Sequence, residues 1–314
     1  MKHDKLDREQ DLFLRQKEIN GTAYNGLTTY RKVFLNINEI IGELDYKDQD
    51  KLEDQVIEYF ETIGRKLKPS TYNSKRMRLN AFFNQLEEDK RIVVNPIHSL
   101  HIKKRKDDTA PRPAKTEDLK TMLSAIDLKS YVGFRDYTFI ILIVDTGIRP
   151  SECVRLKEDY IDLKNLYINL PSEITKTSSP RSVPISLQVA ECIQKLLIAN
   201  KRNFDNSNLF LTESGEDSTT ITFQRRLKHY SDRLGIKITP YQLRHYFGTE
   251  YLKNQGGNLI YLQKLMGHSD ISMTKRYVQV DKEAMANNHR LATPLQNLVK
   301  RNTRVKSIFT DRKE

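Results

Sequence analysis

Two arginines, a lysine and a tyrosine stand in four segments of the sequence whose chemistry suits work on a phosphate. Arg149 follows the glycine turn in "DTGIRPSE", and Arg244 lies in the first turns of a helix predicted for "PYQLRHYFGTEYL". Lys176 precedes a Ser-Ser-Pro turn, and Tyr277 ends "LMGHSDISMTKRY". Taken alone, each has an ordinary explanation, such as a surface salt bridge for an arginine or half-buried packing for a tyrosine. Only their combination indicates a reaction.

Together these four groups meet the needs of an attack on a phosphodiester. Planar guanidinium groups already in place stabilise the charge that builds on the phosphate, so Arg149 and Arg244 form the predicted clamp. A tyrosine hydroxyl has a reference pKa of about 10, and nearby cations favour its ionised form, which makes Tyr277 a candidate nucleophile. Lys176 is a mobile ammonium donor for the departing 5′ oxygen. A phosphotyrosine ester keeps the energy of the cleaved bond, so rejoining needs no ATP.

The composition favours a nucleic-acid partner and predicts no cofactor. The 314 residues carry 53 Lys plus Arg against 41 Asp plus Glu, a net charge of +12, and this excess of cations favours a polyanion. Cys153 and Cys192 are the only cysteines, which excludes a disulfide framework and a paired-thiolate zinc site. No cluster of Asp and Glu resembles a two-metal site, so we expect chemistry without a metal ion. No apolar span or secretory segment is visible, so we expect a cytoplasmic protein without a membrane partner.

The chain is predicted to be mainly α-helical and to contain two domains. Residues 5–92 are charged, poor in glycine and proline, and carry apolar residues at helical spacing, which predicts a bundle of four or five helices. A basic run, two prolines and few apolar residues make 101–115 an extended linker. We place the boundary inside this linker, with one domain at 1–107 and the other at 108–314.

The basic run inside the linker has two open interpretations. It is a solvated connection, or it lies along the phosphates of a nucleic acid and binds them. The run consists of Lys103, Lys104, Arg105 and Lys106.

Local signals predict where the helices begin. Ser70 or Thr71 is expected to be the N-cap of a helix that ends near Glu88, because a short polar side chain can accept a hydrogen bond from the first turn. For the same reason Thr116 is the expected N-cap of the first helix in the second domain. Ser151 is the expected N-cap of the helix "SECVRLK".

Glycines and a proline mark the elements that carry the reactive groups. The segment "RDYTFIILIVDTG" is apolar all round, which predicts a buried helix with Gly147 as its C-cap. Thr239 and Pro240 open the helix of Arg244. Gly267 ends the helix predicted for "NLIYLQKLMG".

A small antiparallel sheet is expected to interrupt these helices. The segment "NLYINL" alternates apolar and polar residues, which predicts a strand. The segment "SEITKTSSPRSVPIS", residues 172–186, predicts two short strands joined by a Ser-Ser-Pro turn. Lys176 would lie just before that turn.

Four motifs, in this order along the second domain, resemble the tyrosine recombinase (phage integrase) family: "TGIRPSE", "TKTSSPRSVPI", "YQLRHYFGT" and "LMGHSDISMTKRY". The resemblance implies a SAM-like helical core-binding domain at 1–107 and a mostly α catalytic domain at 108–314, which together enclose duplex DNA. The site residues that it implies are Arg149 and Arg244 as the phosphate clamp, Lys176 as the general acid, His268 as a phosphate ligand, Tyr277 as the nucleophile, and Glu152 and His245 in supporting positions.

One position departs from the family pattern. The family has histidine three residues before the second arginine, and this sequence has Tyr241 there. A neutral phenol donates a hydrogen bond but is a poor base at neutral pH. Either Tyr241 acts only as a donor to the phosphate, or His268 or a water accepts the proton of the nucleophile.

The resemblance implies a site-specific recombinase that acts on double-stranded DNA with inverted-repeat core sites. Such an enzyme cuts each strand through a covalent 3′-phosphotyrosine, passes through a Holliday junction and works as a homotetramer on DNA. Integration, excision or resolution of a mobile element or replicon would be its task. An accessory directionality factor and a location on the nucleoid are further expectations.

Other interpretations stay open from the sequence alone. A type IB topoisomerase would use the same intermediate as a monomer, and a non-catalytic DNA-binding regulator would keep the fold and the charge. An apolar stripe near the C-terminus either docks on a neighbouring protomer or folds back on its own domain. The stripe consists of Leu291, Leu295 and Val299.

Overall fold

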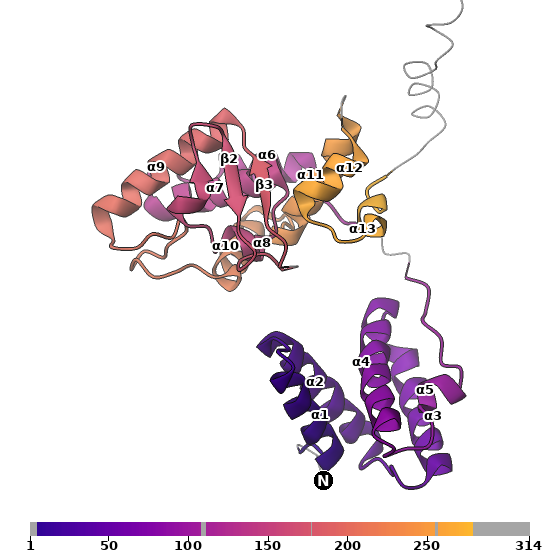
Figure 1. Ribbon diagram of the computed structural model, residues 1–314. Helices are drawn as coiled ribbons and strands as arrows, with labels where there is room; N and C mark the ends of the chain where they lie inside the picture. Colours follow the sequence, from indigo (N-terminus) through magenta and orange to yellow (C-terminus); the bar gives the residue numbers. More distant parts are fainter. Residues whose placement is uncertain (1–4, 108–110, 177, 255–256, 279–314) are drawn as a thin grey trace, which may run out of the picture. The chain divides into compact units, whose positions relative to one another are not determined.

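A computed structural model describes residues 5–107, 111–176, 178–254 and 257–278 (Figure 1). The chain divides into two compact units, Met1–Thr109 and Ala110–Glu314. The described part of the chain is mostly helical with one small antiparallel sheet, which confirms the predicted fold class. The apolar stripe predicted near the C-terminus lies outside the described residues.

The first unit is a bundle of helices around an aromatic core. Edge-to-face contacts join Phe13 to Phe34 and to Phe82, with ring centroids 5.9 and 5.3 Å apart, a favourable arrangement for buried rings. All three rings are buried. The helices are α1 (Arg8–Ile19), α2 (Tyr24–Ile41), α3 (Gln49–Lys66), α4 (Pro69–Glu88) and α5 (Pro96–Ser99).

The start of α4 differs from the prediction. Lys68 is the N-cap residue, and no side chain caps this helix end. Proline takes the first helical position, where its fixed φ is already helical and its missing N–H costs nothing. Ser70 and Thr71 therefore lie inside the first turn, so the predicted cap is wrong. The predicted end at Glu88 is confirmed.

One residue of the basic run, Arg105, binds to the helices of the first unit. The Arg105 guanidinium donates to the carbonyl of Gly64 at 2.6 Å and lies over the ring of Tyr72, 4.0 Å from its centroid. The Arg105 backbone N–H donates to Asn73 at 2.8 Å. Lys103 and Lys104 are exposed. Arg105 thus packs on α3 and α4, which neither of the two sequence interpretations foresaw.

A buried helix, α7 (Tyr131–Thr146), is the central support of the second unit. It packs against α9 (Leu187–Asn203) and α11 (Pro240–Lys253). Gly147 ends it in the left-handed conformation, so the predicted buried helix and its glycine cap are confirmed. The other helices are α6 (Thr116–Ser124), α8 (Pro150–Cys153), the 3₁₀ turn η1 (Glu158–Tyr160), α10 (Thr220–Leu234), α12 (Leu259–Met266) and α13 (Ile271–Lys275).

The remaining N-cap predictions have mixed outcomes. Thr239 caps α11 through its side chain, and Gly267 ends α12 in the left-handed conformation, as predicted. Thr116 is instead the first residue of α6, after Lys115. Ser151 lies within α8, because the N-cap is Arg149. A residue before proline is held extended, so the helix cannot begin before Pro150.

The sheet has the order β1-β2-β3 and is antiparallel throughout. Its strands are β1 (Ile161–Asp162), β2 (Tyr167–Leu170) and β3 (Arg181–Pro184). Ile168 pairs with Val183, and both are buried. The register therefore places the apolar side chains of β2 and β3 on one face.

The hairpin predicted within residues 172–186 is wrong. Only its second half forms a strand, and that strand pairs with β2. Ile174 and Thr175 are both buried, so the alternation of a strand is lost there, and backbone hydrogen bonds turn the chain back on itself. Lys176 thus lies on the β2–β3 connection.

Among the described helices, none combines the length and apolar character that crossing a bilayer requires.

Gly147 offers a test of how α7 is joined to α11. Its φ is +64°, and an added Cβ would lie 2.1 Å from Phe247, whereas Gly235, with φ +67°, has open space around it. Gly235→Ala should cost only the left-handed penalty of about 1–2 kcal/mol. Gly147→Ala should cost roughly 1–3 kcal/mol more, because the ring must move. Urea denaturation of both variants measures the difference, and equal losses would contradict the close approach of Phe247.

Candidate active site

Six of the eight residues predicted for the reaction site meet in the second unit, and one arginine of β3 joins them. They come from the start of α8, from β3, from α11 and from the segments that follow α12 and α13. Hydrogen bonds, ion pairs and ring contacts connect seven residues. We call this group the arginine cluster, and Tyr277 is its phenol. The members are Arg149, Glu152, Arg181, Arg244, His245, His268 and Tyr277.

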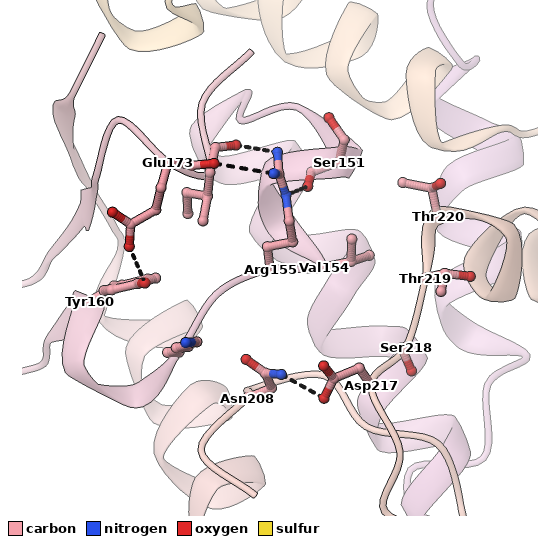
Figure 2. A pocket seen from close by; sticks show the side chains of 12 residues that line it. Ser151, Val154, Arg155, Tyr160, Glu173, Asn208, Asp217, Ser218, Thr219 and Thr220 are labelled. Carbon is pink, nitrogen blue, oxygen red and sulfur yellow. Dashed lines mark hydrogen bonds between the residues drawn. The ribbon is translucent and has the colours of Figure 1, made fainter. Parts of the chain in front are cut away.

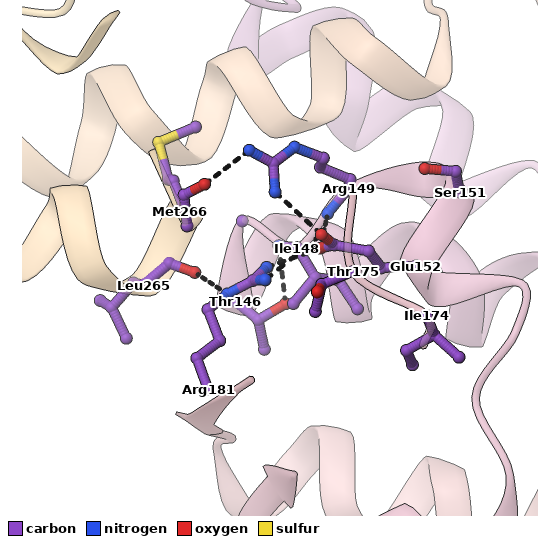
Figure 3. Close-up of polar contacts among 12 residues, drawn as sticks. Thr146, Ile148, Arg149, Ser151, Glu152, Ile174, Thr175, Arg181, Leu265 and Met266 are labelled. Atoms are coloured by element: carbon purple, nitrogen blue, oxygen red, sulfur yellow. Dashed lines mark hydrogen bonds and ion pairs between the residues drawn. The ribbon is translucent and has the colours of Figure 1, made fainter. Parts of the chain in front are cut away.

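Glu152 is a fully buried carboxylate held between two arginines (Figure 3). It lies 2.8 Å from the Arg149 guanidinium and 2.6 Å from that of Arg181, and it also accepts the backbone N–H of Arg149 at 3.0 Å. Burial alone would raise the pKa of this carboxyl, but the hydrogen bonds and charges of the two arginines outweigh burial and lower it to about 2. Glu152 is therefore ionised at neutral pH.

Arg181 is the member of the arginine cluster that the sequence interpretation missed. It begins β3 and lies on the same face as the buried Val183, two positions along. The correct strand register would have pointed it inward. The predicted hairpin assigned this segment to a different pairing, so the signal was lost.

Three arginines donate to three successive backbone carbonyls at the end of α12. Arg181 Nε bonds the carbonyl of Leu265 at 3.0 Å, Arg244 bonds that of Met266 at 2.8 Å, and Arg149 bonds that of Gly267 at 2.6 Å. The last carbonyls of a helix lack partners within the helix and carry partial negative charge. The arginines supply both the missing donors and the opposite charge, which fixes α12 to α8, β3 and α11.

Arg244 is the more deeply buried of the two arginines predicted to form the clamp. It is 5% exposed against 8% for Arg149, and it also donates to the carbonyl of Gly147 at 2.6 Å. Burial and the charge of Arg149 lower the pKa of Arg244 to about 9. The group remains a cation at neutral pH.

The hydrogen positions on His268 follow from its neighbours. Its Nε2 lies 2.9 Å from the Arg244 guanidinium, which can only donate, so Nε2 accepts. The ring proton then belongs on Nδ1, which donates to Thr274 Oγ1 at 2.8 Å. Burial and the charge of Arg244 lower the pKa of His268 to about 4. A bond from His268 to a phosphate stays a prediction. Because a phosphate oxygen accepts, this bond requires a proton on Nε2 as well as an Arg244 N–H turned away from it.

Tyr277 is the buried phenol of the arginine cluster. Its hydroxyl lies 2.8 Å from His245 Nδ1, and its ring is parallel to that of His268 at a centroid distance of 6.3 Å. Burial raises the pKa of Tyr277, and the charges of Arg244 and Arg276 oppose that rise. The cations therefore reduce the penalty for ionising the phenol without cancelling it.

Two predicted site residues lie apart from the cluster in the part of the chain that the structure describes. Tyr241, the second residue of α11, has 54% of its surface exposed, and Lys176 is exposed on the β2–β3 connection. No described hydrogen bond or ion pair joins either of them to the arginine cluster. Both assignments stay predictions.

Arg155 anchors the segment that leads to Lys176 (Figure 2). Its Nε donates to the carbonyl of Ser151 at 2.9 Å, and its other nitrogens donate to the carbonyls of Glu173 and Ile174. These residues line an open pocket of about 550 Å³. Lys176 thus lies on a connection whose first half is tied to α8, the helix whose N-cap is Arg149.

Among the described residues, no group of three or more His, Cys, Asp or Glu side chains is arranged as metal ligands would be.

Known proteins resemble this chain over most of its length. The sequence model of the phage integrase family matches residues 114–284. The tyrosine recombinase XerD of Listeria innocua serovar 6a is 30% identical over 275 residues, which cover 83% of this chain and 90% of that protein. The XerD of Pseudomonas putida is 26% identical over 294 residues, or 91% of this chain and 96% of that protein.

Solved structures share the fold. The Tn1549 transposon integrase in complex with a circular intermediate DNA has a TM-score of 0.72 at 23% identity, covering 90% of this chain and 99% of that one. The XerH recombinase bound to its difH substrate has a TM-score of 0.68 at 19% identity, covering 91% of this chain and 89% of that one.

The depressed pKa of Glu152 makes the stability of the second unit dependent on pH. A carboxyl with a folded pKa of about 2, against an ordinary value of 4.5, stabilises the fold above pH 4.5 and loses that contribution as the pH falls toward 2. The wild-type free energy of unfolding should fall by roughly 3 kcal/mol more than that of Glu152→Gln between pH 5 and pH 2. Urea denaturation across this range measures both curves. Parallel curves would show that Glu152 is not held by the two arginines.

Proposed function

The chain belongs to the phage integrase family, and from this premise we propose that it is a site-specific DNA recombinase that cleaves and rejoins strands through Tyr277. One observation carries the proposal: two guanidinium groups from distant parts of the chain meet beside a buried phenol. Arg149 and Arg244 donate to adjacent carbonyls, and the charge of Arg244 acts on the Tyr277 hydroxyl. The relatives named XerD are tyrosine recombinases by name, and we extend that activity to this chain.

The geometry supports a phosphate as the missing anion of the arginine cluster. Arg149, Arg181 and Arg244 carry three positive charges, and Glu152 is a carboxylate that pairs with two of them, Arg149 and Arg181. A guanidinium has five N–H donors, more than the described hydrogen bonds of each arginine use, so donors remain for phosphate oxygens. Charge that builds up on the phosphate during attack would then meet donors that are already in place.

We propose the following reaction at that phosphate. The Tyr277 oxygen attacks phosphorus, the bond from phosphorus to the 5′ oxygen breaks, and a 3′-phosphotyrosine forms. Lys176 gives a proton to the departing 5′ oxygen. Rejoining runs the same steps in reverse, since the new ester keeps the energy of the broken one.

Double-stranded DNA with inverted-repeat core sites is the proposed partner. The net charge of +12 supports binding to a polyanion, largely through contacts to phosphates. The Tn1549 integrase and XerH were solved with DNA, which supports the same partner here. We further propose that the first unit grips the duplex, with Lys103 and Lys104 along the phosphates. A homotetramer on DNA, an accessory directionality factor and a location on the nucleoid complete the proposal.

A nicked duplex tests the nucleophile. The substrate carries a core site selected by binding from a library of inverted repeats, and the nick lets a short strand diffuse away after cleavage. Wild-type protein should become attached to the 3′ phosphate in a complex that survives detergent, and Tyr277→Phe should form none. Tyr261→Phe is the matched control, because it removes an exposed phenol of α12 in the same unit and should keep the attachment. Attachment by Tyr277→Phe would overturn the proposal.

A sulfur leaving group tests Lys176. Lys176→Ala should slow cleavage roughly 10²- to 10⁴-fold, the usual contribution of a general acid. Replacing the scissile 5′ oxygen with sulfur should restore the rate, because a thiolate leaves without a proton. Lys164→Ala, at an exposed position in the β1–β2 turn, is the control and should cleave the normal substrate at the wild-type rate. A Lys176→Ala defect that sulfur does not correct would assign the proton to another group.

A further inference from the structure

The Tyr277 hydroxyl already has an acceptor in the structure. His245 Nδ1 lies 2.8 Å from that oxygen, within the distance over which a general base takes a proton directly. We infer that His245 is the base that accepts the proton of Tyr277 when the phenol attacks DNA. This inference rests on the proposed function, and it gives a catalytic role to a residue that the family resemblance placed in a supporting position.

The sequence of α11 builds this contact. His245 and Gly248 are three residues apart, so they lie on one face of the helix. A Cβ on Gly248 would lie 2.8 Å from Cε1 of Tyr277 and 2.9 Å from its Cδ1. The phenol ring therefore rests directly on the helix backbone at Gly248, and this close approach brings the hydroxyl to His245. A side chain at position 248 would push the ring away.

The role of a base determines which atom must hold the shared hydrogen. The contact with His245 is the only hydrogen bond of the Tyr277 hydroxyl among the described residues. For His245 to act as a base, the hydroxyl must donate this hydrogen bond and Nδ1 must accept it with its lone pair. The ring proton of neutral His245 then belongs on Nε2.

The electrostatics favour the same arrangement. The groups that face His245 are Arg244 on α11, Arg276 and Tyr277 after α13, and Tyr277 in turn lies beside the neutral His268. Burial, followed by the charges of Arg244 and Arg276, lowers the pKa of His245. The imidazole is therefore unprotonated at neutral pH and able to accept. Because burial raises the pKa of Tyr277, the phenol needs such an acceptor.

The other candidate bases fit less well. His268 Nε2 already accepts from Arg244, and its Nδ1 carries the ring proton. Tyr241 is a phenol with 54% of its surface exposed, and a neutral phenol is a poor base. His245 therefore provides the basic nitrogen that position 241 lacks.

The proton and the electron pairs balance in this step. The O–H bond of Tyr277 breaks, and an N–H bond forms at His245 Nδ1. The phenolate oxygen bonds to phosphorus, and the electron pair of the broken ester bond leaves with the 5′ oxygen, which takes a proton from Lys176. On rejoining, His245 returns its proton to the tyrosine oxygen.

Replacing His245 with Asn separates basicity from tethering. An asparagine amide can still hydrogen-bond the Tyr277 hydroxyl, but it takes up no proton at neutral pH. His245→Asn should fold with an unchanged Tm and bind the selected core site, and its cleavage of the nicked duplex should fall roughly 10²-fold or more. Wild-type cleavage should decline at acid pH as His245 is protonated, and the variant should lack that decline. Cleavage by His245→Asn at the wild-type rate would overturn the inference.

A fluorinated tyrosine at position 277 distinguishes a base from a positioning residue. Ring fluorines lower the phenol pKa, so they should restore most of the cleavage lost in His245→Asn. A variant that had only lost the position of its nucleophile would gain nothing, and that result would refute the role as a base. The 5′-sulfur substrate should not rescue His245→Asn, since rescue would make His245 the acid. If wild-type protein forms no attachment to DNA, the proposed function fails instead.

Discussion

Gathering three guanidinium groups, two of them buried and one partly buried, is the constraint around which the second unit is built. A buried charge is costly unless opposite charge and hydrogen-bond partners surround it. Glu152 provides the opposite charge between Arg149 and Arg181, and the last carbonyls of α12 provide further acceptors. The positive charge of the three arginines is only partly neutralised, because carbonyl dipoles take the place of full anions. This surplus of positive charge is what a phosphate of DNA would neutralise.

The same arrangement determines how the phenol is held. Tyr277 packs in an apolar cluster with Phe247, Leu262 and Met266, and the last of these supplies a carbonyl to Arg244. Met266 therefore helps both to hold a cation and to bury the phenol. Burial keeps the hydroxyl neutral, while Arg244 and His245 lie close enough to assist its ionisation. Stability and reactivity thus depend on one set of contacts around the end of α12.

The sequence predicted correctly several helix ends whose signals act within one or two turns of the chain. Gly147 and Gly267 adopt left-handed conformations that end α7 and α12, and Thr239 caps α11. The predicted N-cap at Ser151 was wrong because Pro150 takes the first helical position. The proline is also a local signal, and here it outweighed the serine. The hairpin within residues 172–186 failed for another reason, because the partner of β3 is β2 and strand pairing depends on the rest of the fold.

The sequence by itself determined which reactive groups the protein has and the motifs that contain them, because residue identity and short spacing suffice for that. Only the tertiary structure decided how they are partnered. Arg181 bonds the carbonyl of Leu265 across 84 positions, and His245 meets Tyr277 across 32. No periodicity extends over such separations. They are fixed by the packing of α11 and α12, by the close approach that Gly248 permits, and by the need of each buried charge for a partner.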